Sequence, residues 1–346
     1  MKKHLNTLYV TLEDAYLRKD GEAVAVRHDD ETKLRVPLHN LEGIVTFGWK
    51  TTVSASLMAG CHQHGVAVTF LTPHGKFISS SYGGVSGNVL LRRQQYRAAD
   101  SEAASLPIAQ NMIAAKLHNT RAILQRAARD HGTKSPDRAH ALTRTADFLV
   151  HRIKSSMRAT SLDSLRGIEG EAAVGYFACF NHLITFDDPA LRLNGRTKRP
   201  PLDRVNALLS FLYVLLAHDC RSACETVGLD PQCGFLHQAR PGRHSLALDL
   251  MEEFRPLFAD RLALSLINRQ QIRADDFDVQ ENGATFLKSD SRKKVLTAWQ
   301  ERKQEPFVHP FIEEKITYGL LPQIQARLLA RHLRGDHDAY PAFLVK

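Results

Sequence analysis

The stretch Gly83-Gly84-Val85-Ser86-Gly87 divides the sequence into two parts with different patterns. Before it, short apolar runs alternate with turn residues such as Lys19-Asp20-Gly21, which is typical of β-strands. One helix is predicted among these strands, at 52–64. The strands themselves are predicted at 8–12, 23–26, 33–38, 43–47, 65–71 and 76–79.

From about residue 88 onward, apolar residues recur at helical spacing, as at Leu106, Ala109, Ile113 and Leu117. Later helices are predicted at 162–183, 203–220, 246–255, 258–269, 291–301 and 310–333. We therefore predict an α+β chain of more than one domain. A small N-terminal β-rich domain should cover 1–87, and a larger all-α domain should cover 88–346.

The composition is that of a globular protein: 43% of the 346 residues are hydrophobic and 24% are charged, which excludes a fibrous or disordered chain. Lys and Arg total 46 against 37 Asp and Glu, and the net charge of +9 favours a polyanionic partner such as nucleic acid. The longest apolar run, 207–217, is shorter than the roughly 20 residues of a membrane span. We expect no signal peptide, no membrane partner and a cytoplasmic location. The five cysteines form no CxxC pair and are expected to be reduced.

Two basic clusters could contact a polyanion. One lies in and beside a loop marked by Asn194-Gly195 and Pro200-Pro201 and contains Arg192, Arg196, Lys198, Arg199 and Arg204. The other follows the predicted boundary and contains Arg92, Arg93 and Arg97. Either cluster could instead be an ordinary solvated surface.

Glu169 is the first candidate for chemistry. Helical steps forward from it reach Ala172, Ala173, Tyr176 and Phe180, so its carboxylate should lie on an apolar face. A buried carboxylate needs a proton, a cation or a metal. An ion pair with a basic side chain of another helix would satisfy this need as well. Glycines at 167 and 170 suggest close approach by another backbone or by a ligand.

The second candidate combines His237 with acids of the helix predicted at 246–255, for which Ser245 is a plausible N-cap. Asp249 and Glu252 are three residues apart and share a face, so they repel each other unless a cation or a proton intervenes. Glu253 should face elsewhere, solvated or paired with Arg255. Glu169, His237, Asp249 and Glu252 together would suit Mg²⁺ or Mn²⁺ better than zinc, and such a metal can activate a phosphodiester.

Four segments in order resemble the motifs of the CRISPR-associated adaptation integrase, the endonuclease subunit that captures new spacers. They are Arg166–Ala173 with Tyr176-Phe177 after it, Lys198–Ser210, Gly234–His237 and Leu246–Pro256. The resemblance covers the whole chain. The C-terminal Arg334-Gly335-Asp336 to Tyr340-Pro341 is similar to the subtype I-C branch of the family.

The resemblance implies that 1–87 is a dimerisation domain and that 88–346 is a helical, metal-dependent catalytic domain. It implies Mg²⁺ or Mn²⁺ held by Glu169, His237 and Glu252, with Asp249 as a further catalytic acid. Glu171 also lies near the motif, but Glu169 fills the central position of its GxEG pattern. The implied reaction is transesterification, in which the 3′-hydroxyl of a short duplex DNA, the prespacer, attacks a phosphodiester of the CRISPR array. Arg196, Lys198, Arg199, Arg204, Arg92 and Arg93 are the expected DNA contacts.

The implied partners are double-stranded DNA, a second copy of the chain and a small ferredoxin-like companion. An iron–sulfur nuclease that trims prespacers is a further partner if the subtype holds. Two alternatives stay open. One is a stand-alone metal-dependent nuclease for branched DNA. The other is a non-catalytic basic DNA-binding scaffold, which predicts that Glu169 is paired with Arg or Lys.

Overall fold

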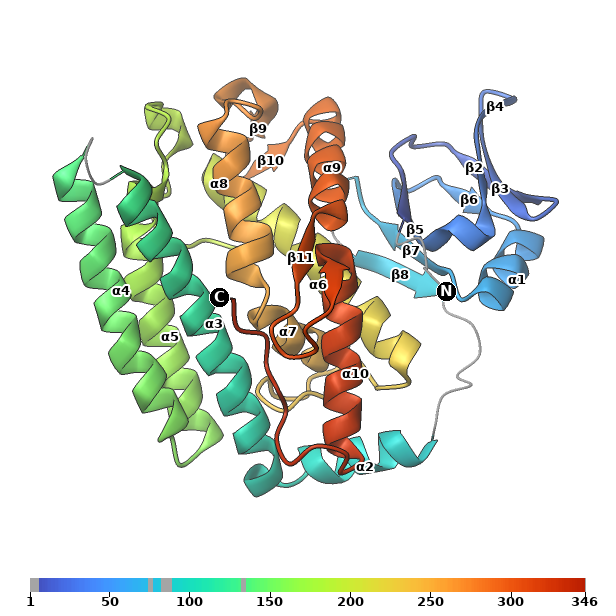
Figure 1. Cartoon of the computed structure of the whole chain (residues 1–346). Coiled ribbons are helices and arrows are strands. Elements are labelled where there is room, and N and C mark those ends of the chain that lie inside the picture. The colour runs from blue at the N-terminus through green and yellow to red at the C-terminus, as the bar shows by residue number, and fades with distance from the viewer. Residues whose placement is uncertain (1–5, 74–76, 82–88, 132–134, 346) are drawn as a thin grey trace. The chain divides into compact units, whose positions relative to one another are not determined.

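The computed structural model describes residues 6–73, 77–81, 89–131 and 135–345, so the dividing stretch 83–87 lies outside the described residues. The chain forms two compact units (Figure 1). Unit 1 contains Met1–Ser86 and Leu287–Gln304, and unit 2 contains Gly87–Phe286 and Glu305–Lys346. Residues 287–304, which the sequence assigned to the helical domain, are thus grouped with unit 1. Helix α9 (Ser289–Gln304) contacts strand β1 there, where Gln300 Nε2 donates to the Thr7 carbonyl at 2.7 Å.

Unit 1 is built on two four-stranded sheets. The first has the order β1-β5-β7-β8, in which β8 alone is antiparallel to its neighbour: β1 (Asn6–Val10), β5 (Leu41–Phe47), β7 (Ala67–Leu71) and β8 (Phe77–Ser81). The second has the order β4-β3-β2-β6, in which the β2–β6 pair alone is parallel: β4 (Glu31–Pro37), β3 (Ala23–His28), β2 (Tyr16–Asp20) and β6 (Thr52–Val53).

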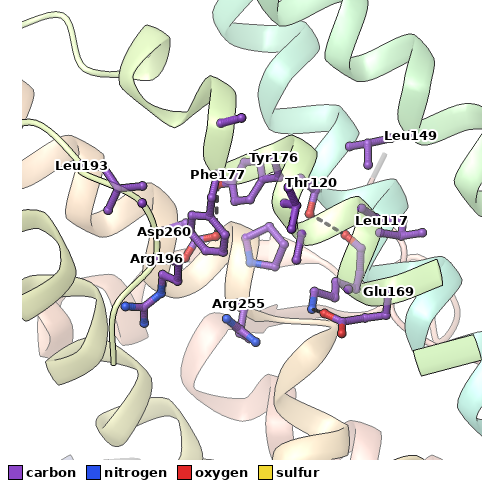
Figure 2. Close-up of a pocket in the computed structure, with 18 of the residues that line it drawn as sticks. Leu117, Thr120, Leu149, Glu169, Tyr176, Phe177, Leu193, Arg196, Arg255 and Asp260 are labelled. Carbon is purple, nitrogen blue, oxygen red and sulfur yellow. Dashed lines mark hydrogen bonds and ion pairs between the residues drawn. The ribbon is translucent and has the colours of Figure 1, made fainter. Parts of the chain in front are cut away.

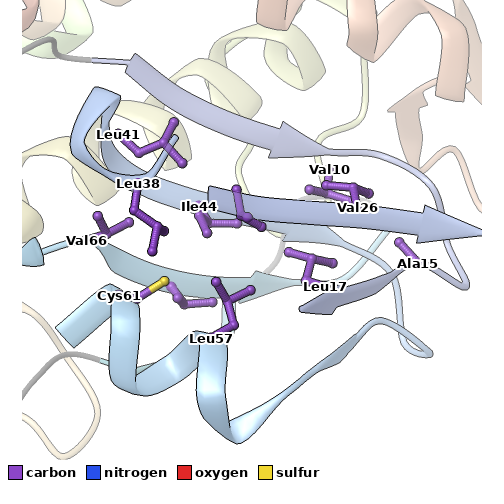
Figure 3. Close-up of a cluster of buried hydrophobic side chains, with 12 residues drawn as sticks. Val10, Ala15, Leu17, Val26, Leu38, Leu41, Ile44, Leu57, Cys61 and Val66 are labelled. Atoms are coloured by element: carbon purple, nitrogen blue, oxygen red, sulfur yellow. The ribbon is translucent and has the colours of Figure 1, made fainter. Parts of the chain in front are cut away.

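Helix α1 (Ala55–His64) supplies part of the core of unit 1. It begins at the N-cap Ser54, whose side chain accepts from the backbone N–H of Leu57, and it ends at Gly65, whose φ of 67° suits glycine. Leu57 and Cys61 point from this helix into the cluster that contains Leu17 and Ile44 (Figure 3). Apolar residues of the strands therefore pack against Leu57 and Cys61 of α1, which is the helix that the sequence predicts at 52–64.

Unit 2 is mostly helical. In Figure 1 the long helices α3, α4 and α5 lie side by side, and α3 and α4 are in extensive contact. The helices are α2 (Val89–Ala99), α3 (Glu102–His131), α4 (Pro136–Met157), α5 (Leu162–Cys179), α6 (Arg204–Val227), α7 (Ser245–Glu252), α8 (Arg261–Asn268) and α10 (Leu321–Leu333). Helix α6 is long and apolar enough to cross a membrane by composition, but 61% of its apolar window is buried in the protein, so it is a core helix.

The structure corrects several details of the prediction for unit 2. The domain is not all-α, because β9 (Phe277–Val279) pairs with β10 (Thr285–Leu287), and β11 (Pro306–Val308) pairs with β12 (Lys315–Thr317). The helix predicted at 310–333 begins only at Leu321, because its first residues turn back to form β12 and Pro322 suits the first turn of a helix.

Other boundaries also shift. The N-cap of α7 is His244, because Ser245 lies inside the helix and donates through its hydroxyl to the carbonyl of Gln238. The residues Pro256–Asp260 form a π-helical turn before α8, where one continuous helix had been predicted from residue 258.

Candidate active site

Glu169 lies on α5, whose first turn is capped by the Ser161 side chain. A Cβ added to Gly167 or Gly170 would meet no atom within 4 Å, so no backbone of another described segment packs against these glycines. The prediction of a close backbone approach is therefore wrong, and the space beside Glu169 is open. The nearby Glu171 points elsewhere on the helix, is 56% exposed and pairs with Arg152 at 2.6 Å.

Asp249 holds the loop that carries His237. Its buried carboxylate accepts hydrogen bonds from the backbone N–H groups of Phe235, Leu236 and His237 at 2.6, 3.0 and 3.0 Å. The Nδ1 atom of His237 lies 2.5 Å from the same carboxylate, which leaves Nε2 for another partner. A Cβ on Gly234 would lie 2.6 Å from Asp249 Oδ2, so only glycine allows this loop to wrap around the acid. Asp249 therefore positions His237.

Glu252 ends α7 and is enclosed by two cations. Arg255 donates to its two carboxylate oxygens at 2.9 and 3.1 Å, and the ammonium of Lys116 lies 2.6 Å from Oε2. Burial opposes ionisation of Glu252, but the charges of Arg255 and Lys116 outweigh burial and hold its pKa well below the usual range. The expectation that Arg255 pairs with Glu253 is therefore wrong.

Lys116 brings the separate segments together. Its ammonium also forms an ion pair with Glu169, so carboxylates from α5 and α7 converge on one side chain of α3. Among the described residues, no three His, Cys, Asp or Glu side chains stand close enough to hold a metal as they are. The site nevertheless holds a cation between Glu169 and Glu252, and His237 lies near enough to interact electrostatically with Glu252. Two carboxylates around one cation, with an imidazole nearby, are donors that suit Mg²⁺ or Mn²⁺.

A cavity of about 610 Å³ adjoins Glu169 (Figure 2). Glu169 and Lys116 lie on its wall together with Lys198 and Arg255. Elsewhere the wall includes the buried Asp260, which accepts from the hydroxyls of Tyr213 and Tyr176 at 2.5 and 3.1 Å. Burial raises the pKa of Asp260, although Arg255 and both tyrosines oppose this shift. The cavity therefore has carboxylate and basic groups on its wall beside the acids that hold the cation.

The predicted DNA contacts have different environments. Lys198 and Arg199 are exposed, whereas Arg196 points inward, where it donates to Asn206 Oδ1 at 2.6 Å and lies over the rings of Phe177 and Tyr213. Arg204 donates to the carbonyl of Ala274 at 3.2 Å. In α2, Arg93 is exposed and Arg92 is half-buried. The side chain of Arg196 thus stabilises its own loop and does not point into solvent.

The sequence analysis did not single out four basic residues near the candidate site. Lys116 stands in the apolar run Met112–Leu117, and a lone charge in such a run is the pattern that could have revealed it. Arg166 donates to the carbonyl of Leu236 at 2.8 Å and so supports the histidine loop. Arg240 and Arg243 follow His237, and burial together with neighbouring arginines lowers the pKa of Arg243.

The sequence matches the family model of CRISPR associated protein Cas1 over residues 8–301. It is 53% identical over 344 residues to CRISPR-associated endonuclease Cas1 1 of Chlorobaculum tepidum, covering 99% of each chain. It is 53% identical over 348 residues to CRISPR-associated endonuclease Cas1 2 of Rhodospirillum rubrum, covering 100% of each. A CRISPR-associated exonuclease Cas4/endonuclease Cas1 fusion of Geobacter sulfurreducens is 36% identical over 98% of this chain and 60% of the fusion.

Solved structures share the fold. A CAS1 protein from Thermotoga maritima superposes with a TM-score of 0.82 at 23% identity, over 99% of this chain and 100% of the other. A casposase bound to integration product gives a TM-score of 0.80 at 22% identity, over 97% and 93%. A chain of a Cas6-RT-Cas1–Cas2 complex gives 0.81 at 24% identity, with 100% of this chain matched to 36% of that one. The chain belongs to the Cas1 family of CRISPR-associated proteins.

Proposed function

We propose that this chain is a metal-dependent endonuclease and integrase of CRISPR adaptation, which joins the 3′-hydroxyl of a prespacer to the CRISPR array by transesterification. The observation that carries the proposal is the convergence of Glu169 and Glu252 on one cation beside His237. Membership of the family, whose curated relatives are named endonucleases, supports an enzyme.

Glu169, Glu252 and His237 are the residues that would hold Mg²⁺ or Mn²⁺, and the bound ion would polarise the attacked phosphodiester as a Lewis acid. Asp249 fixes the ring of His237 through Nδ1, so Nε2 is the nitrogen that would bind the ion. Arg255 keeps Glu252 ionised and oriented. Because no side chain needs to act as a nucleophile, the 3′-hydroxyl itself attacks, and the displaced 3′-oxygen leaves. The reverse reaction resolves a branched DNA at the same site.

The DNA backbone is expected to meet basic groups around this centre. Lys198 stays a candidate because it is exposed and lines the cavity beside Glu169. Arg199 stays a candidate because it is exposed, and Arg240 and Arg243 join it because the charge of Arg243 interacts with those of Arg240 and Arg199. Arg92, Arg93 and Arg204 stay predictions for DNA contact. Arg196 is better suited to holding the loop that presents Lys198, because its guanidinium is bonded to Asn206 and Thr197.

The DNA-binding scaffold predicts that Glu169 is paired with a basic residue, and Glu169 is indeed paired with Lys116. A scaffold, however, gives no reason for Lys116 to gather a second acid, or for Asp249 to fix the ring of His237. The stand-alone nuclease for branched DNA would use the same residues, and only the products of the reaction separate it from an integrase.

The expected partners follow from the relatives. A structure that contains Cas1 and Cas2 supports a small companion subunit, and the Cas4/Cas1 fusions support a nuclease partner that trims prespacers. We propose that the chain forms a homodimer through the unit that contains residues 1–86, that it works in the cytoplasm on double-stranded DNA, and that it belongs to subtype I-C.

The test uses a labelled branched DNA that mimics a half-integrated product, incubated with Mg²⁺, Mn²⁺ or EDTA. We expect metal-dependent release of one strand with rejoining of the other, and we expect Glu169→Ala and His237→Ala to abolish both. Glu171→Ala is the matched control on the same helix, because Glu171 is 56% exposed and forms an ion pair with Arg152, away from Lys116. Cleavage without joining would favour the nuclease, and binding without chemistry in the presence of the companion would favour the scaffold.

A further inference from the structure

Lys116 occupies the gap between the two acids that the proposed metal needs. Its ammonium contacts Glu169 Oε1 and Glu252 Oε2, the latter at 2.6 Å. The side chain of Lys116 is 10% exposed, and that of Glu252 is 7% exposed. Glu169 is more accessible, with its side chain 26% exposed. Two ionised carboxylates from different helices would repel each other across such a gap, so the ammonium between them stabilises their approach.

Arg255 is the other cation at Glu252, and it is held differently. Its guanidinium bonds both oxygens of Glu252 and stacks at 4.3 Å over the ring of Tyr213. Both bonds come from Nη1, and together with the ring of Tyr213 they hold the planar guanidinium on two sides, whereas lysine carries a compact charge on a flexible stem. Lys116 also lines the open cavity beside Glu169, which gives its ammonium room to move. Glu252 would therefore keep one cation partner if Lys116 left.

We propose that Lys116 is a positioning residue that exchanges with the divalent metal: its ammonium holds Glu169 and Glu252 together in the metal-free protein, and the metal binds by displacing it. This inference rests on the proposed metal centre. An ammonium and a divalent cation repel each other strongly at contact distance, so both cannot occupy one gap between two carboxylates. The protein thereby keeps its acids in place without metal, at the expense of metal affinity.

The experiment compares Mn²⁺ binding and thermal unfolding of the metal-stripped full-length chain with those of Lys116→Met and Lys116→Arg. Lys116→Met should bind Mn²⁺ on the order of tenfold more tightly, because the competing cation is gone. Without metal it should unfold roughly 5–10 °C lower, because Glu169 loses its ion pair with Lys116 and the buried Glu252 loses one of its two cations. Lys116→Arg keeps the charge and should bind Mn²⁺ as weakly as the wild type. Arg152→Met, which removes a cation from Glu171 on the same helix α5, should leave Mn²⁺ binding unchanged.

A second measurement uses the wild-type protein, so it does not depend on the folding of a variant. The side-chain NMR signal of Lys116, assigned with Lys116→Arg, should shift on titration with Mg²⁺ as the ammonium leaves the acids. Equal or weaker Mn²⁺ binding by Lys116→Met, or a Lys116 signal that does not move while Mg²⁺ binds, would overturn the exchange and leave the proposed function standing. Failure of the wild type and of every variant to bind either metal would overturn the metal centre itself.

Discussion

Glu252 and Glu253 are adjacent in sequence, and both are buried, yet their surroundings are opposite. Glu252 faces the cations Lys116 and Arg255. Glu253 faces neutral donors: the hydroxyl of Tyr340 at 2.5 Å, the N–H of Phe343 at 2.6 Å and the amide of Gln325 at 3.1 Å. Burial raises the pKa of Glu253 to about 8, and the three hydrogen bonds only partly oppose this shift. The difference shows that the partner, and not the depth of burial, decides the charge of a buried acid.

One turn of helix α3 contacts both Glu252 and Glu253. Lys116 contacts the side chain of Glu252, and Asn119 donates to the carbonyl of Glu253 at 2.8 Å. Asn119 also donates to the carbonyl of Phe343 at 2.9 Å, so it ties the C-terminal segment to the same place. Glu252 is therefore part of the candidate active site, whereas Glu253 binds the C-terminal segment through Tyr340 and Phe343.

The largest effect should come from Glu252→Gln, which removes the carboxylate that pairs with Lys116 and Arg255. We expect strand joining to fall by about a thousandfold or more, because a proposed metal ligand is lost. The free energy of unfolding should fall by about 3 kcal/mol, because Lys116 and Arg255 lose the charge of Glu252. Branched-DNA assays and urea unfolding measure the two effects. Activity within tenfold of the wild type would remove Glu252 from the metal site.

The positions of the acids were largely predictable from the sequence, but their partners were not. Helical spacing places Glu169 on α5 and Glu252 on α7, and the resemblance singles out both. Lys116 is more than 50 residues from Glu169 in the sequence and lies on another helix, so no local pattern joins them. The fold shows the same limit: β12 forms inside the helix predicted at 310–333, because its pairing with β11 is a tertiary contact.

A smaller, pH-dependent effect should follow from Glu253→Gln. The folded chain keeps the proton of Glu253 up to about pH 8, whereas the unfolded chain releases it near pH 4.5. Since the native state then binds more protons, its free energy of unfolding falls as pH rises through this window, by up to about 1.4 kcal/mol per pH unit. Glutamine does not titrate, so the variant should lose this slope. Chemical unfolding at pH values from 5 to 8 tests it, with Glu171→Gln as the exposed control; an unchanged slope would contradict the shift.

The smallest effect should come from Tyr340→Phe, which removes a single donor from Glu253 and leaves the cations at Glu252 untouched. Because the hydroxyl stabilises the ionised carboxylate, its loss should raise the pKa of Glu253 further. It should cost about 1 kcal/mol where Glu253 is charged, above pH 8, and less at pH 6. Far-UV circular dichroism during unfolding at both pH values measures this difference. Strand joining at pH 7 should stay unchanged if the two acids act independently. A parallel loss of joining would show that contacts of the C-terminal segment affect Glu252 through the backbone that it shares with Glu253.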